Sequence, residues 1–121
     1  MIVKLSYIIL FVLLLSVTLN AFYINGFTEK IYTISKASDA SDIKGFSHEF
    51  QKMMRIYEEN EMFVSLTVSH EDLTDIKQLL AEIEGAIAAD DKNAVIIAKS
   101  RLESALLHLG QLSMLNIESV F

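Results

Sequence analysis

The 121-residue chain lacks cysteine, proline and tryptophan, and it has only four glycines. Without cysteine there can be no disulfide, no thiolate nucleophile and no cysteine-ligated zinc site. Tight turns depend heavily on glycine and proline, so the scarcity of both argues against a β-rich domain with many hairpins. These absences favour a helical protein.

Positive charge is scarce as well. The chain has 16 acidic and 10 basic residues, which gives a net charge of −6 with the histidines neutral. Binding to nucleic acid phosphates requires a cationic surface, so we expect no nucleic-acid partner. Peripheral attachment to anionic lipid is disfavoured for the same reason.

An apolar run near the N-terminus is the most informative stretch present. From Leu5 to Ile24 the sequence reads LSYIILFVLLLSVTLNAFYI, without a single charged residue. As a helix this run is about 30 Å long, which matches the hydrocarbon core of a bilayer. We therefore predict one integral membrane span from Leu5 to Ile24.

Two other interpretations of this run stay open, a cleaved signal peptide and a buried core helix. A signal peptide has a shorter apolar stretch and a small-x-small cleavage site, whereas cleavage after Ala21 would place Leu19 at the −3 position. Lys4 alone carries side-chain charge before the run. We therefore expect a single-pass protein of the cell membrane. By the positive-inside rule the one lysine favours a cytoplasmic N-terminus and an extracytoplasmic C-terminal domain.

Apolar residues after the span recur at alternating spacings of three and four, which is typical of amphipathic helices. Three such stripes are Ile43, Phe46, Phe50, Met53 and Tyr57; Leu73, Ile76, Leu80, Ile83 and Ile87; and Val95, Ala98, Leu102, Ala105 and Leu109. Ile96, Ile97, Leu106 and Leu107 are expected to widen the last stripe. The predicted fold class is all-α, an N-terminal transmembrane helix followed by a small antiparallel bundle of three to four helices.

Cap-forming residues mark the expected boundaries. Residues 38–42 read SDASD and predict a break followed by a helix start. Ser69 and Asp72 have capping-box spacing, and Asp90 or Asp91 is expected to cap the last helix. We therefore divide the chain into an anchor at residues 1–27, a stalk or short helix at 28–41 and a bundle domain at 42–121. The tail after Gly110 is expected to fold back over the bundle.

No catalytic, cofactor-binding or metal-binding residue is predicted, and no cofactor is expected. The three histidines are His48, His70 and His108, and none belongs to an H-E-x-x-H or Glu-x-x-His pattern. Glu58, Glu59 and Glu61 are expected to be a solvated helix face, with a contact surface for a basic partner or a divalent cation as the alternative.

Methionine is concentrated around the first of these stripes and near the C-terminus, at Met53, Met54, Met62 and Met114. Methionine usually fills irregular gaps in a core, but it also forms adaptable surfaces for partner helices. We expect core filling, and an interaction surface if the stripe is only half covered.

Several segments resemble a known family. They are Tyr57, the residues 63–66 leading to His70 and Glu71, the alanine-rich hairpin at 88–92, and the ending at 115–121. Over essentially the whole chain these features are similar to the bacterial domain-of-unknown-function family 4363. The resemblance implies a small Gram-positive bacterial protein with a single span and a helical remainder, and it implies no activity.

Taken together, these patterns favour a membrane-anchored, non-enzymatic helical module that acts by protein–protein contact, with a protein partner or a second copy of itself. The alternative is an extracytoplasmic sensor that binds a small ligand or ion between the bundle helices. That alternative depends on the surplus of aromatic and methionine residues in the predicted helix that begins at Ile43, among them Phe46, Phe50, Tyr57 and Phe63.

Overall fold

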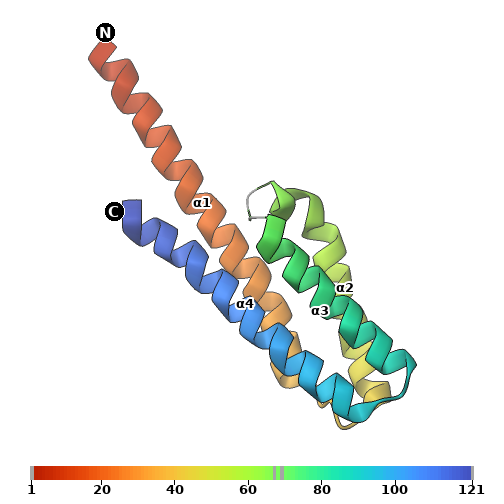
Figure 1. The fold of residues 1–121 in the computed structure, drawn as a ribbon. Helices are drawn as coiled ribbons and strands as arrows, with labels where there is room; N and C mark the ends of the chain where they lie inside the picture. Colours follow the sequence, from red (N-terminus) through yellow and green to blue (C-terminus); the bar gives the residue numbers. More distant parts are fainter. Residues whose placement is uncertain (1, 67, 69, 121) are drawn as a thin grey trace.

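The computed structural model describes residues 2–66, 68 and 70–120, with side chains described in residues 3–66, 68 and 71–111. Four helices, and no strand, form this part of the chain: α1 (Ile2–Ala37), α2 (Ile43–Ser65), α3 (His70–Ala88) and α4 (Lys92–Val120). Short connections make successive helices antiparallel, and α4 returns alongside α1 (Figure 1). The predicted all-α fold is confirmed.

The apolar stripes form the core, as their spacing predicted. Phe46, Phe50 and Met53 of α2 pack with Ile76, Leu80 and Ile83 of α3 and with Val95, Leu102 and Leu106 of α4, and all of these are buried. The expected widening of the α4 stripe is correct only for Leu106. Ile96, Ile97 and Leu107 are exposed, because they lie on the side of α4 that no other described helix covers.

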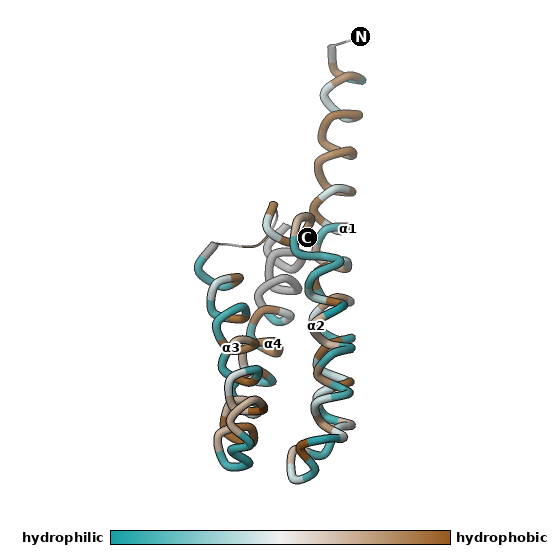
Figure 2. The backbone as a smooth tube through the Cα atoms, turned by 90° about the vertical axis from the view of Figure 1, so that its right-hand side faces the viewer, coloured by the Kyte–Doolittle hydropathy of each residue, from teal (hydrophilic) through white to brown (hydrophobic). Residues whose placement is uncertain are grey.

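Helix α1 has two different halves. Its large apolar side chains from Val3 to Leu19 are mostly exposed, whereas Ala21, Ile24, Phe27 and Ile31 are buried in the bundle. Figure 2 shows the apolar N-terminal half extending beyond the other helices. The expected stalk at 28–41 is therefore different in the structure: residues 28–37 continue α1, and they pack against α4 because the three-four apolar spacing runs on past the span.

Aspartates define the helix boundaries. Asp42 is the N-cap of α2 and accepts a hydrogen bond from the Gly45 N–H at 3.3 Å, and Asp91 accepts one from the Ala94 N–H at 3.1 Å. Asp90 has a φ of +53° and follows α3 with the 6→1 and 5→2 backbone hydrogen bonds of a Schellman motif. Ser69, the first residue of the expected capping box, lies outside the described residues.

Gly110 is a close-packing residue rather than a helix stop. α4 continues as a helix to Val120, so the expected fold-back of the tail is wrong. A Cβ atom at position 110 would lie 3.2 Å from the Thr28 Oγ1 and 3.3 Å from the Asn25 Oδ1. The missing side chain therefore lets α4 approach α1 closely and remain helical.

Candidate functional site

The exposed flank of α1 is the first candidate. By length and composition α1 is the one helix among the described residues that could cross a membrane. Most of its large apolar side chains from Val3 to Phe22 are exposed, and they lie on all sides of the helix. This exposure does not fit a helix buried in a protein core. The Thr18 hydroxyl donates to the Leu14 carbonyl at 2.9 Å, so this polar group is satisfied within the helix, as an apolar surrounding requires.

Bundle packing begins at Ala21 and includes Ile24, so the exposed apolar run ends at Phe22, two residues before the predicted end of the span. Residues 3–22 still give about 30 Å of helix. That length is sufficient for the hydrocarbon core of a bilayer.

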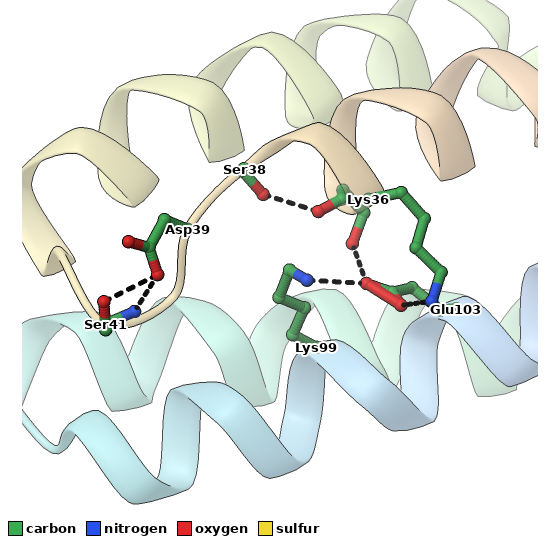
Figure 3. Close-up of polar contacts among 7 residues, drawn as sticks. Lys36, Ser38, Asp39, Ser41, Lys99 and Glu103 are labelled. Carbon is green, nitrogen blue, oxygen red and sulfur yellow. Dashed lines mark hydrogen bonds and ion pairs between the residues drawn. The ribbon is translucent and has the colours of Figure 1, made fainter.

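A buried carboxylate between α1 and α4 is the second candidate. Glu103 is only 7% exposed, and its Oε1 accepts hydrogen bonds from the Ser35 hydroxyl at 2.9 Å and from the Lys99 Nζ at 2.8 Å. Its Oε2 lies 3.3 Å from the Lys36 Nζ. Figure 3 shows the carboxylate between the two lysines. We call Ser35, Lys36, Lys99 and Glu103 the Glu103 cluster.

The Glu103 cluster is suited to fixing two helices and not to proton transfer. Burial by itself raises the pKa of Glu103, but hydrogen bonds from Lys99 and Ser35 and the charge of Lys99 outweigh it and lower the pKa below the ordinary value. A carboxylate that is held ionised by three donors is a weak base. The arrangement therefore fixes the register of α1 against α4.

The sequence alone does not predict this cluster. Ser35 lies four residues after Ile31, on the same face as the buried residues of α1. Glu103 lies four residues after Lys99, one position beyond the apolar stripe of α4. The signal was thus a polar residue on an apolar face of each helix, and it becomes visible only when α1 is known to enter the bundle.

Among the described side chains, His48, His108 and the acidic cluster at Glu58, Glu59 and Glu61 do not form a metal site. His48 and His108 are exposed on α2 and α4, and the side chain of His70 lies outside the described residues. No group of three or more potential metal ligands occurs in the described part of the chain. Glu58 and Glu59 are exposed, while Glu61 lies 3.4 Å from the Lys77 Nζ.

Most of the aromatic and methionine residues of α2 are core residues. Phe46, Phe50, Tyr57 and Met53 are buried, and the Phe27 and Tyr57 rings lie 6.4 Å apart. Met54 is partly buried against the core, whereas Met62 and Phe63 are exposed, and Met114 lies outside the described side chains. The expectation of core filling therefore holds for Met53 and Met54 and is wrong for Met62.

The outward side of α4 is the third candidate. Ile96, Ile97 and Leu107 are exposed there, beside an open groove of about 430 Å³ between α3 and α4. The groove is lined mostly by polar or small side chains, namely Asp75, Gln78, Leu79, Glu82, Ser100, Arg101, Ser104 and Ala105. Apolar residues flanking small ones suit the approach of another helix.

No protein-family model, curated protein or solved structure matches the chain. The resemblance to the family 4363 thus stays a prediction.

Proposed function

We propose that the chain is a single-span membrane protein whose helical bundle is a non-enzymatic protein-interaction module outside the cytoplasm. The observation that carries the proposal is the flank of α1 from Val3 to Leu19, which is apolar, exposed and left uncovered by the rest of the bundle. Exposed apolar surface of this extent is unfavourable in water. A bilayer is the surrounding that its length and composition fit best.

The outward side of α4 supports the interaction role. Ile97 is 60% exposed, and it lies with Ile96 and Leu107 on a helix face that the fold leaves free. Large apolar residues on such a face are typical of contacts between proteins. The partner in this proposal is another protein or a second copy of the chain.

Protease accessibility in intact cells tests the anchoring and the orientation. We expect an externally added protease to remove the C-terminal domain from intact cells, with a mature chain whose mass still includes Lys4. Protection until the cells are permeabilised would reverse the orientation. A mature mass that lacks the apolar run would show a cleaved signal peptide instead.

A charge substitution tests the interaction role. Ile97→Asp places a carboxylate on the outward face of α4, and Gln51→Asp places one on an exposed position of α2 as the matched control. We expect light scattering in detergent, or cross-linking in membranes, to detect a complex for the wild type and for Gln51→Asp, and a weaker one for Ile97→Asp. A lone monomer with no cross-linked partner would contradict the proposal.

A further inference from the structure

Exposed apolar residues also occur at the end of α2. Met62 is 82% exposed, Phe63 53% and Leu66 78%. We call these three residues the α2 tip. The preceding outer face of the same helix is polar and charged, including Gln51, Lys52, Arg55, Glu58 and Glu59, so the apolar exposure is confined to this end of α2.

The α2 tip lies where the exposed flank of α1 begins. The ring centroids of Phe63 and Tyr23 are 4.6 Å apart, and the Tyr23 hydroxyl donates a hydrogen bond to the Asn60 Oδ1. Tyr23 follows directly after Phe22, the last exposed apolar residue of α1. Figure 1 and Figure 2 both show the end of α2 at the level of the middle of α1, at the end of the bundle from which α1 extends.

We propose that the α2 tip inserts into the interfacial region of the same membrane that α1 spans, so that the bundle is held against the lipid surface at two points. This inference rests on the proposed anchoring by α1. If the hydrocarbon core covers residues 3–22, its boundary falls at Phe22, and the neighbouring tip then lies in the interface. From Met62 to Leu66 the helix rises about 6 Å, within the depth of about 5–10 Å to which interfacial helices enter a membrane.

The charges near the tip identify the kind of membrane contact. Glu61 is the residue directly before Met62, and Glu71 and Asp72 lie in the first turn of α3, just after the tip. Lys77 lies 3.4 Å from Glu61, but the surrounding is still net acidic, so attraction to anionic headgroups cannot drive the insertion. Burial of apolar side chains drives it instead, and zwitterionic lipid is sufficient as the ligand.

Single tryptophans can test the contact because the chain has none of its own. Leu66→Trp and Met62→Trp report on the tip, Phe11→Trp on the span, and Ile97→Trp on an exposed apolar position of α4 that is not near the tip. Each full-length variant is reconstituted into phosphatidylcholine vesicles, with and without a mixture of lipids brominated near the top and near the end of the acyl chains. Circular dichroism verifies that all four retain the helical content of the wild type.

We expect brominated lipid to reduce the emission of Leu66→Trp, Met62→Trp and Phe11→Trp but not that of Ile97→Trp. Adding phosphatidylserine should not increase the quenching at the tip. Emission from both tip variants that is unquenched and typical of water, while Phe11→Trp is quenched, would overturn this inference and leave the anchoring intact. Blue-shifted emission without quenching would also overturn it, because a second copy or another protein would then cover the tip. An unquenched Phe11→Trp would instead overturn the anchoring.

Discussion

Replacing Glu103 by alanine should destabilise the bundle far more than the loss of an ordinary surface carboxylate. The substitution removes the common acceptor of Ser35, Lys36 and Lys99. The Ser35 side chain is fully buried and the Lys99 side chain is largely buried. The Ser35 hydroxyl cannot reach water without moving α1 away from α4.

The expected size of the effect follows from these contacts. A hydrogen bond to a charged group contributes about 1.5–3 kcal/mol, and a buried donor left without a partner costs about 1–3 kcal/mol. Breaking a fully buried ion pair costs about 3–5 kcal/mol. Lys36 is half-exposed and adds little. We therefore expect Glu103→Ala to lower the free energy of unfolding by about 3 kcal/mol.

Glu82→Ala provides the matched control. Glu82 also pairs with a cation, the Arg101 guanidinium at 2.9 Å, but both side chains are well exposed. Its loss should cost less than about 1 kcal/mol. Urea unfolding of the full chain in detergent micelles, followed by circular dichroism, measures both variants. Equal destabilisation by the two substitutions would refute the argument that burial makes the Glu103 contacts strong.

The pH dependence gives an independent check on the same group. The folded pKa of Glu103 is below its ordinary value of 4.5, because hydrogen bonds from Lys99 and Ser35 outweigh the effect of burial. The unfolded chain therefore binds this proton first as the pH falls. The stabilisation is complete above the ordinary pKa and is lost as the pH falls through the folded pKa. Relative to Glu103→Gln, the wild type should lose stability in that acidic range, and parallel curves would contradict the assignment.

Further substitutions test the packing and the caps by the same unfolding assay. Gly110→Leu should cost about 2 kcal/mol because the side chain meets α1, whereas Gly85→Leu should be neutral or stabilising because nothing lies within 4 Å of its Cβ position. Asp91→Ala should cost about 1 kcal/mol through loss of the N-cap bond of α4.

The fold of α2, α3 and α4 could be predicted because each of these helices carries its own signals. Each has a three-four apolar stripe, and aspartates such as Asp42 and Asp91 mark two of the starts. These signals are local in the sequence. The two sides of α4 were harder to distinguish, because Ile97 and Leu106 are equally apolar and only the packing shows which is covered.

It was harder to predict that α1 has an exposed apolar half and a second half that packs in the bundle. Hydropathy identifies the apolar run but does not show where lipid-facing packing would change to bundle packing. Ile24, Phe27 and Ile31 carry a stripe of their own, but it overlaps the end of the apolar run. The Glu103 cluster depends on this point, since Ser35 acquires a buried partner only when α1 lies against α4.

The continuity of α1 has a mechanical consequence for the proposed anchor. The helix passes without interruption from the exposed apolar flank into the bundle. Contacts on two sides then hold it in place: Tyr23 with Phe63 on α2, and Ser35 with Glu103 on α4. A flexible stalk would let the bundle turn freely relative to the membrane, whereas a packed helix passes the tilt of the span directly to the bundle. The orientation of the outward face of α4 is then set by the membrane itself, which limits the directions from which a partner can approach.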